Sequence, residues 1–275
     1  MALNHRIKKI LKILSMNEIK VDESIRLADL KRFDPMRIFY KKADYTVNRE
    51  GYLIPVRIFY PNRNIFETKK KRTRNVMVFF HGGGWVTDSI DSYERICAKL
   101  STATNHMVIA VNYRLAPEFK FPIGLDDCYE VTKTIFKDVE AEYITLIGDS
   151  AGGNLAAALS LLARDRQEFL PHRQILIYPA VSGDYSTSSP YPSVHENGQD
   201  YVLTIGKLQD YTSLYRLKEE DKTNPYYAPL LAEDFSHQPD TLIITAEFDP
   251  LRDEGEVYGK KIKESRELCG SAPDS

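Results

Sequence analysis

Short, continuous runs of apolar residues alternate with segments of helical pattern along most of this chain. The runs Val76–Phe80 and Met107–Asn112 contain almost no polar residue. A strand is apolar on both sides when helices cover both faces of a parallel sheet. The alternation therefore predicts an α/β fold with a mostly parallel central sheet and helices on both faces. The other predicted elements are strands at Tyr143–Ile147, Gln174–Tyr178 and Thr241–Thr245, and helices at Asp91–Thr104, Leu125–Lys137, Ala151–Arg164 and Glu254–Leu268.

Two segments depart from this alternation. Extended segments at 43–47 and 53–60 flank the turn Asn48–Gly51 and predict an opening antiparallel hairpin. Residues 182–217 hold clusters of Ser, Pro, Tyr and Asn followed by a weak helix, and predict an insertion over the carboxyl edge of the sheet. Because α/β domains often reach 275 residues, we expect a single domain over 1–275.

Charge and apolar patterning exclude several kinds of partner. The formal net charge is −2, which favours neither nucleic acid nor an anionic membrane. No stretch of 18 apolar residues could span a bilayer, and the basic, apolar segment 1–20 predicts an amphipathic helix on the protein body rather than a signal peptide. Cys97, Cys128 and Cys269 lack the close spacing of a metal site or a disulfide framework. We therefore expect a cytoplasmic protein without a bound metal or stable membrane insertion.

A serine between glycines stands where a strand must become a helix. The sequence GDSAG at 148–152 follows the strand 143–147 and precedes an Ala/Leu-rich helix. A strand, a G-x-S-x-G turn and a helix in this order form the nucleophile elbow of serine hydrolases. The turn raises the Ser150 hydroxyl above the sheet, beside the free amides of a helix N-terminus that favour negative charge. We predict Ser150 as a catalytic nucleophile.

Three consecutive glycines follow the strand 76–80, in the sequence HGGGW at 81–85. Glycines let the backbone approach a ligand closely and present its N–H groups, which is what an oxyanion needs. We predict that the amides of Gly83, Gly84 and Ala151 form an oxyanion hole. His81 is expected to be a structural hydrogen-bonding residue rather than a base.

A carboxylate for a catalytic triad stands after the last predicted strand. Asp249 follows the carboxyl end of strand 241–245, where active sites of α/β proteins collect. Asp253 has an alternative role in the first turn of the next helix, and Glu247 is the reserve candidate. We predict Asp249 as the acid.

Four motifs together resemble the hormone-sensitive-lipase-like family of α/β-hydrolases. They are HGGGW at 81–85, NYRLAPE at 112–118 with Phe121-Pro122 and Asp126 after it, GDSAGGN at 148–154, and DPLRDEG at 249–255. The resemblance implies an α/β-hydrolase fold and a carboxylesterase that cleaves short or medium acyl esters through an acyl-enzyme, without a cofactor. It also implies a cap formed from about 1–40 and 182–217, and a structural role for residues 113–118 in bracing the oxyanion loop.

The chain departs from the family pattern after Asp249. The family places its triad histidine beyond one more helix and a final strand, but no residue after Asp249 is a histidine. The tail 269–275 is polar and turn-like, so we expect the last strand to be missing. No histidine base is identified, and we hypothesise that activity is impaired because the chain is truncated or altered near its C-terminus. The other histidines lie in the cap, in the glycine loop or on the opposite edge of the sheet: His5, His81, His106, His172, His195 and His237.

Two other functions stay open from the residues alone. Loss of the base favours a non-catalytic protein that binds a small ligand on the same fold, and an amidase or peptidase would use the same machinery. Retention of both Ser150 and Asp249 favours the ester hydrolase. The expected partner is a small-molecule ester substrate, and pairing of exposed edge strands could join two copies into a homodimer.

Overall fold

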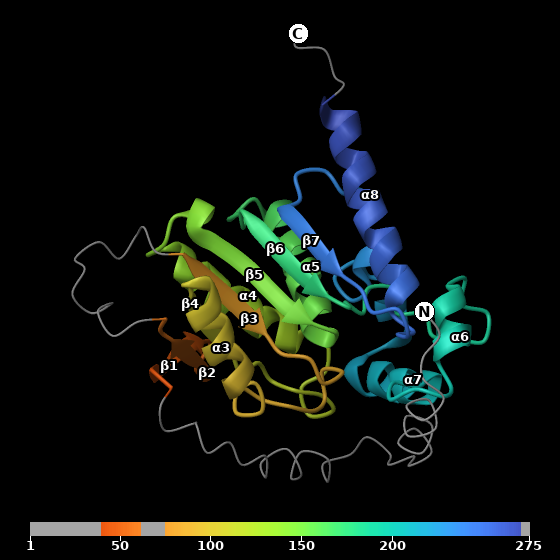
Figure 1. Cartoon of the computed structure of the whole chain (residues 1–275), viewed down its shortest axis with the longest axis horizontal. Coiled ribbons are helices and arrows are strands. Elements are labelled where there is room, and N and C mark those ends of the chain that lie inside the picture. Colours follow the sequence, from red (N-terminus) through yellow and green to blue (C-terminus); the bar gives the residue numbers. More distant parts are fainter. Residues whose placement is uncertain (1–39, 62–74, 271–275) are drawn as a thin grey trace.

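A seven-stranded sheet forms the centre of the molecule (Figure 1). The computed structural model describes residues 40–61 and 75–270. The strand order is β1-β2-β4-β3-β5-β6-β7; β1 and β2 form an antiparallel hairpin, β2 pairs antiparallel with β4, and the other pairs are parallel. The strands are β1 (Lys42–Arg49), β2 (Tyr52–Phe59), β3 (Val76–Phe80), β4 (Met107–Val111), β5 (Ile144–Asp149), β6 (Arg173–Ile177) and β7 (Asp240–Ile244). The predicted opening hairpin and parallel sheet are confirmed.

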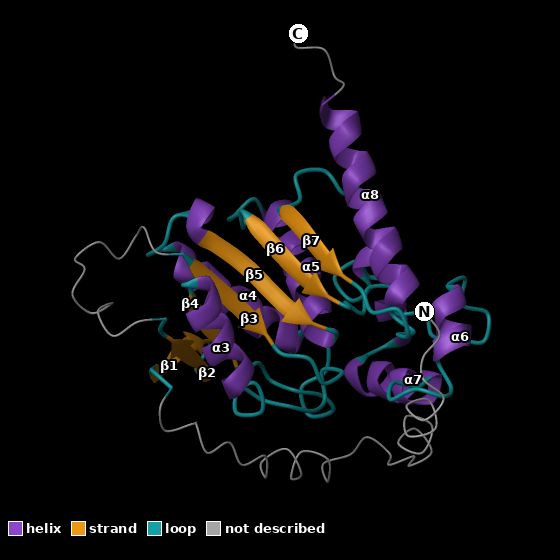
Figure 2. Ribbon diagram, in the orientation of Figure 1, coloured by secondary structure: helices purple, strands orange, loops and turns teal. Residues whose placement is uncertain are grey.

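Helices cover both faces of the sheet (Figure 2). One apolar core joins α4 and α5 to one face, and a smaller core joins α3 to Met77 and Phe79 on the other face. Helix α5 is buried along most of its length, which explains its Ala- and Leu-rich sequence without a polar stripe. The main helices are α3 (Glu94–Thr104), α4 (Ile123–Phe136), α5 (Ala151–Arg166) and α8 (Arg252–Gly270), with a short 3₁₀ turn η4 (Ala141–Tyr143) before β5.

The helix predicted from Asp91 begins three residues later, at Glu94. Residues 91–93 form a turn instead. The Asp91 carboxylate pairs with Arg57 of β2 at 2.6 Å, and the turn is closed by a hydrogen bond from the Ser89 amide to the Ser92 hydroxyl. This contact with a distant strand fixes the start of α3, and local sequence pattern could not reveal it.

The segment between β6 and β7 lies beyond the carboxyl ends of the parallel strands, as the insertion at 182–217 predicts (Figure 1). Its predicted weak helix is α7 (Ile205–Tyr215). The sequence analysis missed α6 (Pro192–Asn197) and two 3₁₀ turns, η5 (Glu219–Thr223) and η6 (Pro229–Leu231). The expected N-terminal cap element and amphipathic helix lie outside the described residues.

Strand β7 is the last strand of the part of the chain that the structure covers. Helix α8 packs against β7 and extends beyond the sheet (Figure 1). On the other face of β7, Leu242 and Ile244 are 53% and 45% exposed. β7 is also the end of the strand order, so up to Gly270 no described strand pairs with its outer edge, as the sequence predicts. None of the helices described here is long and apolar enough to cross a membrane.

Candidate active site

Ser150 occupies the sharp turn between β5 and α5. Its φ of 52° and ψ of −116° lie where residues other than glycine are strained, at a cost of about 1–3 kcal/mol. The turn is so tight that a Cβ at Gly148 would overlap the Gly152 carbonyl, and a Cβ at Gly152 would overlap the carbonyl of Phe80. The two glycines therefore allow strand, serine and helix to meet. The Ser150 amide donates to the Ile177 carbonyl at 2.9 Å, and the residue is half-buried.

The predicted oxyanion loop, residues 81–85, lies directly against this turn, since a Cβ at Gly152 would also overlap the His81 carbonyl. Its backbone turns back at Gly83, whose φ is 97° and whose carbonyl accepts hydrogen bonds from the Val86 and Thr87 amides. Within residues 40–61 and 75–270, the amides of Gly83, Gly84 and Ala151 donate no hydrogen bond. Three amide donors close to a helix N-terminus are free for an external acceptor, and a developing negative charge is the acceptor that they suit best.

The segment after β4 supports the oxyanion loop. The Tyr113 hydroxyl donates to the His81 carbonyl at 2.7 Å, and the two rings stack with centroids 4.4 Å apart. The Ala116 amide donates to the Trp85 carbonyl at 2.9 Å. The buried His81 ring has its Nδ1 atom 2.7 Å from the Gly82 carbonyl. These contacts agree with the expected structural roles of His81 and of residues 113–118.

Helix α7 of the insertion covers the same loop. A Cβ at Gly84 would overlap the ring of Tyr211, so this ring lies directly on the glycine. Tyr215 stacks on Trp85 with ring centroids 4.6 Å apart and an interplanar angle of 2°. The Phe121 amide donates to the Tyr215 carbonyl at 2.8 Å. The insertion is thus packed onto the oxyanion loop by two tyrosines of one helix.

Asp249 lies in the turn after β7, at the same edge of the sheet as Ser150. Parallel pairing of β5 with β6 and of β6 with β7 brings their carboxyl ends together. Burial raises the pKa of Asp249, and the Leu251 amide donates to its carboxylate at 2.9 Å. Tyr178, which the sequence analysis placed at the end of a strand without a role at this site, follows β6, between the strands that lead to Ser150 and Asp249. Burial and then the charges of Asp149 and Asp249 raise its pKa.

The acid turn, residues 247–254, is fixed to the insertion by side chains. The Asp253 carboxylate accepts the Ser193 amide of α6 at 2.7 Å, and the Ser193 hydroxyl donates to the Pro250 carbonyl at 2.8 Å. Asp253 therefore joins α8 to α6, which extends the helix-start role expected for it. The reserve candidate Glu247 is exposed.

Glu254 is a buried carboxylate that the sequence analysis did not single out. It accepts hydrogen bonds from the Val181 amide at 2.6 Å, the Ser182 hydroxyl at 2.6 Å and the Tyr185 hydroxyl at 3.1 Å. Burial raises its pKa to about 7, against the opposing effect of these donors. The only sequence signal was its place in the DPLRDEG motif, which does not reveal burial.

In the described segments, the ring nitrogens of His81, His106 and His195 contact residues other than the candidate nucleophile and acid. No histidine is hydrogen-bonded to Ser150 or Asp249 in this part of the chain. His195, on the insertion, has its Nε2 atom 2.9 Å from the Ser189 carbonyl. His106 has its Nδ1 atom 2.8 Å from the Thr104 carbonyl, two residues earlier in the chain. No group of His, Cys, Asp and Glu within the covered residues could hold a metal ion.

Comparisons with known proteins agree with this architecture. A family model described as alpha/beta hydrolase fold matches residues 77–271. The arylesterase of Saccharolobus solfataricus is 38% identical over 229 residues, which cover 81% of this chain and 71% of that protein. The ethyl acetate hydrolase of Pseudomonas putida is 30% identical over 268 residues, covering 92% of this chain and 80% of the relative. A solved structure of a hyperthermophilic esterase from the archaeon Pyrobaculum calidifontis is 33% identical, with a TM-score of 0.81, and covers 96% of this chain and 86% of that chain.

These relatives bear the names of ester hydrolases, so they favour the esterase over the binding protein and the amidase that the residues alone left open. The matched segment contains the oxyanion loop, the Ser150 turn and the acid turn. The chain therefore belongs to the hormone-sensitive-lipase-like family of α/β-hydrolases, a family of carboxylesterases.

Proposed function

We propose that this hydrolase of the carboxylesterase type cleaves small carboxylic esters with short or medium acyl chains, and that Ser150 forms the acyl-enzyme. The observation that carries the proposal is the strained Ser150 turn beside three amides without an internal partner. Strain of this kind persists where the surrounding structure fixes it, and it is concentrated at active sites. The names of the relatives support an ester as the substrate.

In the proposed first step, the Ser150 oxygen attacks the ester carbonyl carbon, and its proton is transferred to a base. The carbonyl oxygen becomes an oxyanion that accepts hydrogen bonds from the amides of Gly83, Gly84 and Ala151. The intermediate then collapses, the alcohol leaves with a proton, and water hydrolyses the acyl-enzyme in a second round of the same chemistry. Oxyanion-hole donors act mainly in the transition state, because the charge that they bind develops there.

The role of Asp249 in this scheme is to orient a histidine and stabilise its charged form. The described residues supply no histidine for that position, so we assign the base to none of them. Losing one triad member leaves residual catalysis from the oxyanion hole and substrate binding. We therefore propose slow, Ser150-dependent ester hydrolysis by the chain as its sequence stands.

The experiment compares the chain with Ser150→Ala in the hydrolysis of p-nitrophenyl acetate and p-nitrophenyl butyrate. We expect the parent to release p-nitrophenol faster than the variant, because only the parent can form the acyl-enzyme. Ser160→Ala is the matched control, since Ser160 lies inside α5 and bonds to Ala156 and Gln174. Equal rates for the parent and Ser150→Ala would overturn the proposal.

A further inference from the structure

We infer that Tyr93 and Asp149 form a positioning pair that holds the oxyanion loop in register with the Ser150 turn. The inference rests on the proposed function, since it concerns the same loop. Asp149 immediately precedes Ser150 and is 8% exposed. Its Oδ2 atom accepts the Tyr93 hydroxyl at 2.6 Å, and its Oδ1 atom accepts the Gly82 amide at 3.0 Å. The Asp149 carboxylate thus connects the Ser150 turn to Gly82, the residue that precedes the predicted oxyanion donors Gly83 and Gly84.

Tyr93 reaches this carboxylate from the start of α3, a separate element. Its ring packs against Phe79 of β3 and against His81 of the oxyanion loop, with centroid distances of 5.5 and 5.8 Å. Its hydroxyl also lies 3.3 Å from the Gly82 amide. The tyrosine therefore contacts the loop through its ring, and contacts both the loop and the elbow through its oxygen.

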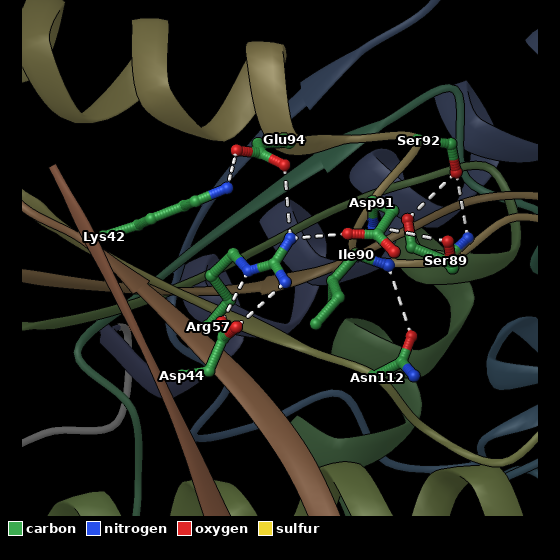
Figure 3. Close-up of polar contacts among 9 residues, drawn as sticks. All are labelled: Lys42, Asp44, Arg57, Ser89, Ile90, Asp91, Ser92, Glu94 and Asn112. Carbon is green, nitrogen blue, oxygen red and sulfur yellow. Dashed lines mark hydrogen bonds and ion pairs between the residues drawn. The ribbon is translucent and has the colours of Figure 1, made fainter. Parts of the chain in front are cut away.

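A cluster of charges, the Arg57 cluster, fixes the turn that carries Tyr93 (Figure 3). Arg57 of β2 binds Asp91 at 2.6 Å and Glu94 at 3.2 Å, on either side of Tyr93. Its remaining donors bind both carboxylate oxygens of Asp44, at 2.6 and 3.1 Å. Lys42 of β1 pairs with the other Glu94 oxygen. The bidentate contact with Asp44 fixes the guanidinium within the hairpin, and its Nη1 atom, which binds both Asp91 and Glu94, holds this turn against the hairpin.

The strand on the other side of the turn adds a neutral contact. The Asn112 side chain accepts the Ile90 amide at 3.2 Å, as Figure 3 shows. The turn before α3 is therefore tied both to β2 and to the end of β4. Tyr93 has little freedom to move away from Asp149, and the pair can act as a rigid spacer between the loop and the elbow.

The expected effect of the pair is on the chemical step. Anchoring the Gly82 amide fixes the peptide that leads into Gly83 and Gly84, whose amides must point at the oxyanion. A misplacement of about 1 Å at such donors can cost about 10²-fold in rate. Because the oxyanion forms only in the transition state, loss of the pair should lower kcat and leave KM nearly unchanged.

The same carboxylate makes the arrangement sensitive to pH. Burial raises the pKa of Asp149 to about 6, and the nearby charge of Asp88 adds to this shift, against the opposing hydrogen bonds from Tyr93 and Gly82. Above that pH both carboxylate oxygens accept hydrogen bonds. Below it the carboxyl group is neutral, so its hydrogen bonds with the Tyr93 hydroxyl and the Gly82 amide lose their charge assistance and weaken. The other titratable groups around Asp149 are Cys97 on α3, Tyr113 after β4 and Tyr178 after β6, whose pKa values are all raised.

The test removes only the Tyr93 hydroxyl, in Tyr93→Phe, and follows amide hydrogen exchange of a peptide spanning residues 81–87. We expect exchange in this peptide to rise about tenfold while the melting temperature changes little, because the ring contacts remain. Tyr129→Phe is the matched control: it also removes a hydroxyl bound to a carboxylate, that of Glu168 at 3.0 Å, but on the opposite side of the sheet. Unchanged exchange at 81–87 in Tyr93→Phe would overturn the inference.

A second measurement gives the kinetic readout. The rate of p-nitrophenol release should fall about tenfold in kcat for Tyr93→Phe, with KM within about twofold of the parent. In the parent, exchange of the 81–87 peptide, corrected for the intrinsic exchange rate at each pH, should rise below about pH 6 as Asp149 takes up a proton. Asp149→Asn keeps the shape but cannot ionise, so this rise should be absent from the variant. A rise in KM with kcat unchanged would contradict the inference. If the parent shows no Ser150-dependent hydrolysis, the proposed function fails, whereas hydrogen exchange still decides whether the pair holds the loop.

Discussion

Ser150 adopts a backbone conformation that few side-chain-bearing residues take, and its glycine neighbours make that conformation possible. Gly152 matters most, because its α-carbon faces the carbonyls of Phe80 and His81 at the end of β3. The serine, the oxyanion loop and the helix N-terminus therefore meet at one point only if this position carries no side chain. Even the single methyl group of an alanine at position 152 would overlap the Phe80 carbonyl.

We predict that Gly152→Ala lowers the free energy of unfolding by about 1–3 kcal/mol, because the new methyl group forces the elbow and the β3 end apart. Urea unfolding measures the change. Gly206→Ala is the control, since a Cβ there meets only the Thr204 hydroxyl at 3.9 Å, within α7. An equal unfolding midpoint for Gly152→Ala and the parent would show that the close approach is absent.

The nucleophile elbow and the glycine loop could be predicted from the sequence because each depends on neighbouring residues. Strand, G-x-S-x-G and helix follow each other directly, and steric limits at Gly148 and Gly152 act within the same turn. The Tyr93–Asp149 contact could not be predicted in this way. It joins residues 56 positions apart, and its geometry depends on Arg57 in a third segment.

Helix α7 shows how one element of the insertion is held on the oxyanion loop. Tyr215 is almost fully buried between Trp85, Tyr227 and the edge of Phe121. Its hydroxyl has no hydrogen-bond partner within the residues that the structure covers. The ring, and not the hydroxyl, therefore supplies the packing that places α7.

We predict opposite results for two substitutions of this residue. Tyr215→Ala should lower the free energy of unfolding by about 3–5 kcal/mol, because a large aromatic side chain leaves a cavity. Tyr215→Phe should leave stability unchanged or raise it, since it removes a buried hydroxyl without a partner. Chemical denaturation of both variants measures these changes. A large loss in Tyr215→Phe would mean that the hydroxyl is bonded.

Helix α8 is joined to the insertion by Glu254, and this contact has a pH dependence. Its folded-state pKa, about 7, lies above the ordinary value of 4.5. The folded protein therefore holds this proton more tightly than the unfolded chain does. The resulting stabilisation is fully present below about pH 4.5 and is lost as the pH rises through 7.

We predict that Glu254→Gln has a flatter dependence of stability on pH between 5 and 7 than the parent. The glutamine does not ionise, so the contribution of this group to the slope disappears. Absolute stability falls because the amide cannot accept all four hydrogen bonds that the carboxylate accepts, from the Val181 and Ser182 amides and the Ser182 and Tyr185 hydroxyls. Urea unfolding at several pH values measures the slope. Parallel curves for the two proteins would place the Glu254 pKa outside this range.

At the scale of the whole molecule, the candidate site lies at the carboxyl ends of four parallel strands. β5 leads to Ser150, β6 to Tyr178 and β7 to the acid turn, while the oxyanion loop follows β3. Periodicity predicted the parallel sheet that brings these turns to one edge, because apolar runs of strand length alternate with helices. It did not predict α6 or the contacts of the insertion, which depend on packing between distant segments.

We predict that the chain gains activity when a strand followed by a histidine is added after α8. A histidine within reach of Asp249 and Ser150 would complete the proton transfer, and the absence of one triad member costs about 10⁴-fold or more in rate. The matched control carries alanine in place of the added histidine. Equal p-nitrophenyl ester hydrolysis by the two extended chains would show that a missing base does not limit the reaction.

The most direct measurement of the central claim is a crystal structure after reaction with a p-nitrophenyl alkylphosphonate, which mimics the tetrahedral intermediate of ester cleavage. We expect phosphorus bonded to the Ser150 oxygen, with a phosphonyl oxygen within about 3 Å of the amides of Gly83, Gly84 and Ala151. Phosphorus on another residue, or an adduct on Ser150 whose oxygen points away from those amides, would contradict the claim that this turn and the glycine loop form one catalytic site.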